Sequence, residues 1–265
     1  MSPRISIITI NRNNDKGLKK TIESVIQQTY KNIEFIIVDG ASSDNSVEII
    51  KSYANSLSWW VSEPDSGIYN AMNKGLDKAG GEYLLFLNSG DYLENDSILQ
   101  QVAPFLDGTD IVYGDLIIAE TGRQWVKKYN SKLTFGYFFY DTLPHQAAFI
   151  NRNIITRVGS YDESLKVCAD WKFFIDAVCR YNATLGYVNK IITVYDYTGV
   201  SSDPQNLDWV NKEKYQVFEQ HYQRYLPDYL ELDELRKKYP PLANSRAIKI
   251  YLKLRSAVLG IVRRK

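Results

Sequence analysis

The sequence has only two cysteines among its 265 residues, Cys168 and Cys179. Both lie on a segment with helical character, in which their separation of eleven positions corresponds to about 16 Å. A disulfide bond needs Cα atoms within roughly 7 Å of each other, so this pair is too far apart to form one. We therefore expect two reduced thiols, as is usual in a cytoplasmic protein.

Long hydrophobic runs are also missing. No segment approaches the roughly 18 uncharged apolar residues that a transmembrane helix needs. The N-terminal stretch MSPRISIITI enters a β-branched run at once and shows no signal-peptide pattern. With 32 basic and 31 acidic residues the net charge is +1, which provides no overall field to attract nucleic acid. These absences predict a cytoplasmic globular protein with no nucleic-acid partner.

The N-terminal part of the chain shows a regular alternation of two patterns. Continuous apolar runs, often β-branched, predict buried strands at 5–10, 33–38, 58–62 and 82–87. Apolar residues at helical spacing predict intervening helices at 16–28, 44–53 and 67–79. This alternation predicts right-handed crossovers and an α/β, Rossmann-like fold with a mostly parallel sheet.

The pattern changes after Pro104. Shorter runs predict strands of a mixed or antiparallel part of the sheet, at 110–115, 116–120, 123–129, 145–151, 184–188 and 191–197. Helices are expected at 169–181 and from 206 onward, with breaks at Pro227 and Pro240–Pro241. The second half therefore completes the sheet, and the C-terminal part forms a helical extension.

Polar side chains follow the predicted strands where these end, at Asn11, at Asp39 and in the segment Asn88–Asp91. In open α/β sheets, ligands bind beyond the carboxyl ends of strands. An acidic edge accommodates a diphosphate when a divalent cation lies between them, and oxygen ligands suit Mg²⁺ and Mn²⁺. The sequence thus predicts a ligand site at this edge, which suits a cation or a ribose, against the simpler hypothesis that Asp91 only forms a turn.

Five motifs, taken in order, are similar to the family 2 glycosyltransferases: SIITINRN, EFIIVDGASSDNS, SEPDSGIYNAMNKGLDKAGGEYLLFLNSGD, PHQAAF and ADWKFF. The resemblance covers roughly residues 4–200 and is strongest to bacterial enzymes of colanic acid, O-antigen and exopolysaccharide assembly. It implies a GT-A fold and inverting transfer of a sugar from a nucleotide sugar, by default UDP-linked, to a glycan acceptor that we expect to be lipid-linked. It also implies a catalytic domain over 1–205, with a donor-binding half (1–104), an acceptor-binding half (105–205) and an extension over 206–265.

The resemblance implies roles for particular residues. Asp170, at the start of a predicted helix, corresponds to the general base, and Asp91 to the ligand of a divalent cation, Mn²⁺ or Mg²⁺. Many relatives carry an arginine at the position of Met72, and Lys74 is expected to supply that charge. The side chains expected to bind the donor are Thr9, Asn11, Asn13, Asp39, Asn73, Lys74, Asn88 and Ser89. His145 and Trp171 are expected near the acceptor.

Several hypotheses stay open at this stage. His145 is a third metal ligand, an acceptor contact or a structural imidazole. From Arg246 onward the chain has seven Lys or Arg and no acid, which favours a basic helix over 245–265 on an anionic membrane surface. Packing of that helix on the domain or on a partner is the alternative. For the whole chain, the competing functions are a sugar-1-phosphate nucleotidyltransferase and a non-catalytic nucleotide- or glycan-binding partner of an assembly complex.

Overall fold

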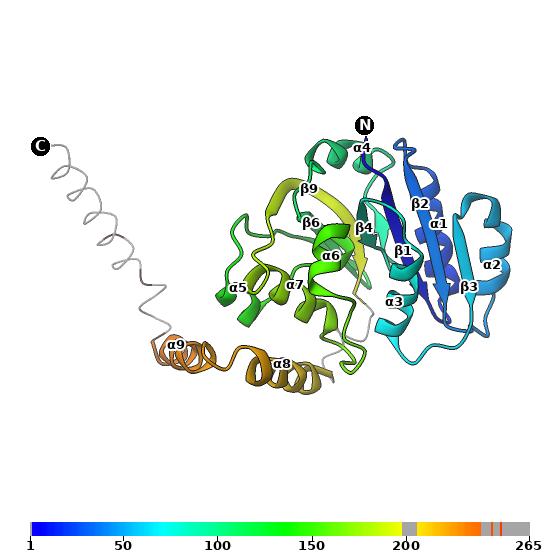
Figure 1. Ribbon diagram of the computed structural model, residues 1–265. Coiled ribbons are helices and arrows are strands. Elements are labelled where there is room, and N and C mark those ends of the chain that lie inside the picture. The colour runs from blue at the N-terminus through cyan, green and yellow to red at the C-terminus, as the bar shows by residue number, and fades with distance from the viewer. Residues whose placement is uncertain (1, 198–205, 240–244, 246–249, 251–265) are drawn as a thin grey trace, which may run out of the picture. The chain divides into compact units, whose positions relative to one another are not determined.

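A nine-stranded mixed sheet organises the N-terminal unit of the chain (Figure 1). The computed structural model describes residues 2–197, 206–239, 245 and 250. By their contacts the residues divide into two units, Met1–Lys214 and Tyr215–Lys265, and the division lies within helix α8 (Leu207–His221). The first unit holds the whole sheet and the candidate site.

Four parallel strands form one half of the sheet, in the order β3-β2-β1-β4. They are β1 (Ile5–Asn11), β2 (Ile33–Asp39), β3 (Trp59–Ser62) and β4 (Tyr83–Phe86). The helices between them are α1 (Asp15–Ile26), α2 (Ser46–Ser52) and α3 (Ile68–Lys78). The chain moves outward from β1 to β3 and then returns to β4, so right-handed crossovers place α1 and α2 on one face and α3 on the other (Figure 1). The predicted α/β fold is confirmed.

The other half of the sheet is mixed. Strand β8 (Ala148–Asn151) pairs antiparallel with β4 and with β6 (Ile111–Glu120). Outward from β6 lies β9 (Leu185–Asp196), which runs parallel to it and pairs with the short β5 (Tyr92–Leu93). Strand β7 (Arg123–Lys127) forms a hairpin with β6.

Two of these strands are longer than the sequence predicted. Where two strands each were expected, β6 and β9 are single strands, because a register shift at Gly114 and Asp115 lets their pairing continue. Glycine is required at this irregularity, since a Cβ on Gly114 would lie 2.7 Å from the Lys190 carbonyl oxygen. The prediction of separate strands was wrong because Gly114 interrupts the apolar run without ending the strand.

The remaining helices are α4 (Ile98–Val102), α5 (Phe135–Tyr140), α6 (Arg152–Val158), α7 (Ala169–Cys179), α8 and α9 (Leu226–Lys238). Pro227 is the second residue of α9. A missing N–H is tolerated there, so Pro227 lies in the first turn of this helix. Within the described ranges, no helix is long and apolar enough to cross a membrane. The basic segment predicted over 245–265 lies outside the described residues, apart from positions 245 and 250.

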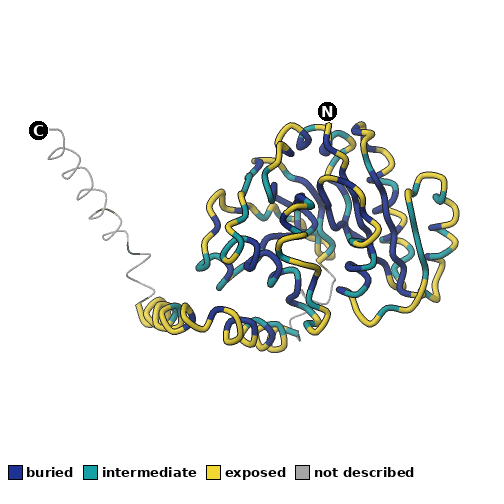
Figure 2. The backbone as a smooth tube through the Cα atoms, viewed as in Figure 1, coloured by how far each residue is buried: buried dark blue, intermediate teal, exposed yellow. Residues whose placement is uncertain are grey.

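The hydrophobic core lies on both faces of the sheet. Figure 2 shows the central strands in dark blue, the colour of buried residues. Every residue of β1 and of β4 is buried. Helix α1 buries one stripe, formed by Leu18, Thr21, Ile22 and Val25, and exposes its other side. Cys168 and Cys179 are both free, as predicted.

The strand order changes direction at β1, which has β2 on one side and β4 on the other. Ligands of open α/β sheets bind at the carboxyl ends of strands on either side of such a reversal. The segments that leave β1 and β4 there are 11–14 and 88–91. The fold therefore brings together the polar strand ends that the sequence singled out.

Candidate active site

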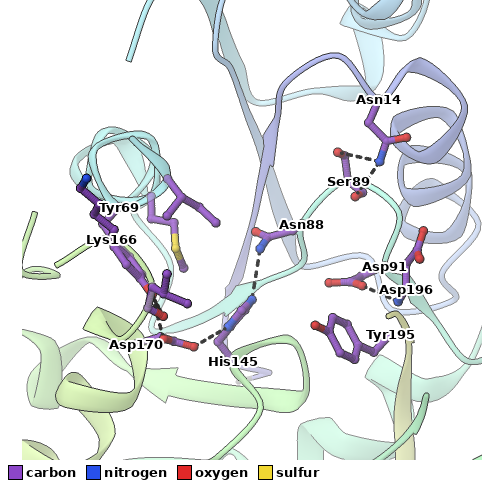
Figure 3. A pocket seen from close by; sticks show the side chains of 13 residues that line it. Asn14, Tyr69, Asn88, Ser89, Asp91, His145, Lys166, Asp170, Tyr195 and Asp196 are labelled. Carbon is purple, nitrogen blue, oxygen red and sulfur yellow. Dashed lines mark hydrogen bonds and ion pairs between the residues drawn. The ribbon is translucent and has the colours of Figure 1, made fainter. Parts of the chain in front are cut away.

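A pocket of about 440 Å³ lies at the carboxyl ends of β1 and β4 (Figure 3). Segments that are far apart in the sequence contribute its walls: α3, the turn after β4, the start of α7 and the end of β9. The lining residues are Asn14, Ile68, Tyr69, Met72, Asn88, Ser89, Asp91, His145, Lys166, Val167, Asp170, Tyr195 and Asp196. Asp91 and Asp170 thus share one pocket.

The turn Asn88–Asp91 is held in place by α1. The fully buried hydroxyl of Thr21 accepts a hydrogen bond from the Gly90 N–H at 3.0 Å and donates to the Asp91 carbonyl at 2.7 Å. Asn14, the N-cap of α1, donates from its side chain to another carbonyl of the turn at 3.0 Å. Gly90 has a φ of +105°, which is open mainly to glycine. The turn is therefore built to present Asp91 to the pocket.

Asp91 lies beside a second carboxylate, that of Asp196 at the end of β9. Oδ1 of Asp91 accepts a hydrogen bond from the Asp196 backbone N–H at 2.9 Å. Burial raises the pKa of Asp91 to about 7; the Asp196 N–H and His145 oppose this rise, whereas the Asp196 carboxylate adds to it. A Cβ on Gly90 would lie 3.1 Å from Asp196 Oδ2, so glycine also leaves room for this second carboxylate.

The two carboxylates fit a divalent cation that is shared with a diphosphate. Two hard oxygen ligands leave positions for phosphate oxygens and water, as Mg²⁺ and Mn²⁺ prefer. A positive ion would also lower the pKa of Asp91, which burial and the neighbouring Asp196 carboxylate raise. In the described part of the chain, no group of three or more His, Cys, Asp or Glu side chains is placed to hold a metal ion. Such a cation would therefore depend on oxygens from the ligand.

Asp170 lies in the first turn of α7, and two side chains hold its carboxylate (Figure 3). The Tyr69 hydroxyl donates to Oδ1 at 2.9 Å, and Nδ1 of His145 lies 3.1 Å from Oδ2. Burial would raise the pKa of Asp170, but His145, Tyr69 and the Trp171 N–H together lower it below its ordinary value. The carboxylate is therefore ionised at neutral pH, as a proton acceptor must be.

His145 connects the two sides of the pocket. Its Nε2 lies 3.2 Å from Nδ2 of Asn88, and its Nδ1 faces Asp170. A proton on Nδ1 allows the ring to donate to the Asp170 carboxylate, and Nε2 faces the Asn88 amide. With both ring nitrogens engaged by protein groups, the geometry favours a positioning role for His145 over metal ligation.

A second polar cluster lies at the ends of β1, β2 and β3. Asp39 is fully buried and accepts hydrogen bonds from Asn11 at 2.7 Å, from Ser62 at 2.6 Å, and from the Ser42 hydroxyl and N–H at 2.6 and 3.0 Å. Burial would raise the pKa of Asp39, but these donors lower it. Asn13, with a φ of +51°, donates its N–H to the Ser42 hydroxyl and so fixes the same loop. Among the described residues, Oδ1 of Asn11 is a buried acceptor without a hydrogen-bond partner.

Several residues that the sequence predicted for binding do not line the pocket. Thr9 is fully buried, and its hydroxyl donates to a backbone carbonyl after β4 at 2.7 Å. Trp171 is buried, and its ring N–H donates to a carbonyl of α5 at 2.8 Å. Lys74 pairs with Glu63 at 2.7 Å, so its charge is engaged outside the pocket. Lys166 lines the pocket instead.

Asn73 also belongs to the scaffold. Its Oδ1 accepts from the Tyr161 N–H at 2.9 Å, and its Nδ2 donates to the Tyr161 carbonyl at 2.9 Å and to Glu163 at 2.8 Å. These bonds join α3 to the segment that precedes α7. Asn73 therefore holds two walls of the pocket together from behind.

We expect Asn73→Ala to lower the free energy of unfolding by about 2–3 kcal/mol, because it leaves the buried N–H and carbonyl of Tyr161 unpaired. Urea unfolding measures this loss. Asn70→Ala is the matched control: Asn70 lies on the same helix and donates to Glu163 at 2.9 Å from a more exposed position, so its loss should be smaller. Unchanged stability of Asn73→Ala together with weaker donor binding would instead assign Asn73 to the ligand.

Sequence reasoning did not identify several of the lining residues, among them Lys166, Tyr195 and Asp196. Asp196 is the last residue of β9, as Asp39 is of β2, but the predicted strand continued to position 197, so its place at a strand end was not apparent. Lys166 precedes a predicted helix in an irregular segment and has no local pattern that marks it. Only the folded chain shows that these residues face Asp91 and Asp170.

The model of glycosyl transferase family 2 matches residues 6–164 of the chain. A PGL/p-HBAD biosynthesis glycosyltransferase of Mycobacterium bovis is 31% identical over 204 residues, which are 75% of this chain and 78% of the relative. An uncharacterized glycosyltransferase of Mycobacterium tuberculosis is 30% identical over 206 residues, with 76% of this chain and 78% of the relative covered.

Solved structures share the fold at lower sequence identity. The UDP complex of TarS residues 1–349 from S. aureus superposes with a TM-score of 0.62 at 22% identity, over 73% of this chain and 60% of that one. The chain thus spans less than two thirds of that TarS structure. A mannosyltransferase from Pyrobaculum calidifontis, in complex with GDP-Man and Mn²⁺, superposes with a TM-score of 0.61 at 17% identity, over 97% of this chain and 81% of that one.

Proposed function

Because this chain belongs to glycosyltransferase family 2 and has the fold of these enzymes, we propose that it transfers a sugar from a nucleotide sugar to a glycan acceptor with inversion at the anomeric carbon. The observation that carries this proposal is the shared pocket. It places the ionised Asp170 opposite the paired carboxylates of Asp91 and Asp196. Its volume of about 440 Å³ lies within the range of small-molecule sites.

Asp170 acts as the general base in this proposal. The acceptor hydroxyl oxygen forms a bond to the anomeric carbon while the bond between that carbon and the diphosphate oxygen breaks. The acceptor proton passes to Asp170, and the electron pair leaves with the nucleoside diphosphate. Proton removal by a positioned carboxylate typically contributes about 10²–10⁴ in rate. Tyr69 and His145 hold that carboxylate toward the pocket.

Asp91 and Asp196 would hold a Mn²⁺ or Mg²⁺ ion, which supplies charge neutralisation for the leaving diphosphate. The protein's own contribution is to keep both carboxylates in place, through the turn Asn88–Asp91 and the hydrogen bond between the two residues. The buried Oδ1 of Asn11, beside Asp39, is the acceptor that we assign to a nucleotide N–H or hydroxyl. Lys166 adds a positive charge at the pocket wall.

We take UDP as the first nucleotide to test and GDP as the second, since similar structures hold UDP, UDP-GlcNAc or GDP-Man. The acceptor that we propose is a glycan, lipid-linked as for the surface-polysaccharide enzymes that the motifs resemble. A basic C-terminal segment on the membrane would bring the enzyme to such an acceptor.

A panel of UDP- and GDP-sugars with Mn²⁺ tests the function. We expect release of UDP or GDP from one donor, first by slow hydrolysis and then faster with a suitable acceptor. A sugar-1-phosphate nucleotidyltransferase would instead release pyrophosphate from a nucleoside triphosphate. A binding partner would bind nucleotide and release nothing. Either result would overturn the proposed transfer.

A further inference from the structure

Glu213 on helix α8 is a buried carboxylate that the transfer chemistry does not use. It is 5% exposed and lies within the unit Met1–Lys214. Its two oxygens accept hydrogen bonds from three consecutive backbone N–H groups, those of Lys166 at 2.8 Å, Val167 at 3.0 Å and Cys168 at 3.1 Å. A carboxylate from a distant helix thus satisfies three consecutive N–H groups of the main chain.

The three N–H groups lie immediately before α7, which begins at Ala169. The start of a helix carries unpaired N–H groups and a partial positive charge, so a carboxylate is stabilised there. Hydrogen bonds to a charged group are also roughly twice as strong as neutral ones. Glu213 therefore fixes the segment 166–168, which leads into α7, to α8.

The same segment forms one wall of the pocket. Lys166 and Val167 line it, and Asp170 follows two residues after the clamped stretch. The Tyr69 hydroxyl lies 2.6 Å from the Val167 carbonyl oxygen and 2.9 Å from Oδ1 of Asp170, so its single proton is shared between these two acceptors. A displacement of the segment would therefore shift the Tyr69–Asp170 contact as well as the wall itself.

Two further contacts join α8 to this part of the chain. The Cys168 thiol lies 3.5 Å from the Val210 carbonyl, and the ammonium group of Lys166 lies 5.1 Å from the centre of the Trp209 ring. The thiol contact is weak and the ring contact involves an exposed lysine, so neither can define the geometry. Glu213 is the group with the number and direction of bonds to do so.

We propose that Glu213 is a positioning residue for the transfer reaction, which fixes the segment 166–168 and thereby places Asp170 at the pocket. The inference rests on the proposed function, because its catalytic readout is sugar transfer. Its structural readout, the protection of three backbone N–H groups, can be measured without any substrate. The two claims can therefore fail separately.

The test compares Glu213→Gln with Glu219→Gln, an exposed glutamate on the same helix. Glutamine keeps the length of the side chain but has one oxygen and one N–H₂ group, so it cannot accept from all three N–H groups. By hydrogen exchange and mass spectrometry, we expect the peptide over 164–170 to exchange about tenfold faster or more in Glu213→Gln. Glu219→Gln should match the wild type.

The kinetic part separates positioning from binding. We expect Glu213→Gln to lower kcat about tenfold while the donor KM and UDP affinity stay within about twofold of wild type. Glu213→Asp keeps the charge and should restore part of kcat. If the wild type transfers sugar and Glu213→Gln has an equal kcat, the positioning role is wrong. It is also wrong if hydrogen exchange over 164–170 is unchanged in Glu213→Gln. If the wild type transfers no sugar, the proposed function fails first.

Discussion

Asp170→Asn is expected to lower kcat for sugar transfer by about 10²–10⁴, because the amide cannot take the acceptor proton. The substitution keeps the size of the side chain and one hydrogen-bond acceptor, so Tyr69 can still donate to it. Nucleotide affinity should change little, since Asp170 lies on the α7 side of the pocket. Steady-state transfer and calorimetric titration with UDP measure the two quantities.

Asp77→Asn is the control for this experiment, since Asp77 is an exposed carboxylate on α3 and the substitution removes the same charge. It should leave both kcat and UDP affinity at wild-type values. The pKa of Asp170 lies below its ordinary value, so the base stays ionised from neutral pH down to mildly acidic pH. Near-normal turnover by Asp170→Asn would show that another group accepts the proton.

The sequence predicted the first half of the fold well because each element there is defined by local pattern. The β-branched run at 5–10 and the helical spacing within 16–28 correspond to β1 and α1. Beyond Pro104 the local pattern was a weaker guide. One strand was expected to end at position 115, yet β6 continues to Glu120, with Gly114 in close approach to the Lys190 carbonyl. A packing contact of this kind leaves no periodic signal.

For the site, the sequence located two acids, Asp91 from its place after a buried strand and Asp170 from the family resemblance. Asp91 lies in the turn that follows β4 and Asp170 in the first turn of α7, and both line the pocket. Side-chain direction was harder to predict, because Thr9 lies on a strand that is buried on both faces. The role of Glu213 was out of reach, since its partners are backbone groups about 45 positions away.

The second large effect is expected from the carboxylate pair Asp91 and Asp196, which we propose to hold a divalent cation. We expect Asp91→Asn to lower transfer by at least about 10²-fold, because the loss of a ligand weakens neutralisation of the leaving diphosphate. The effect of the cation on UDP binding can be measured without sugar transfer. Wild-type protein should bind UDP more tightly with Mn²⁺ than without it, and Asp91→Asn should bind UDP equally in both conditions.

Two further variants sharpen this prediction. Asp196→Asn should lose part of the Mn²⁺ effect on UDP binding, because its backbone N–H still holds Asp91 when its carboxylate is gone. Asp96→Asn removes an exposed carboxylate a few positions after the turn and should behave as wild type. If Asp91→Asn keeps the full Mn²⁺ effect, the cation is held elsewhere. The close pairing of Asp91 and Asp196 would then serve only to shape the pocket.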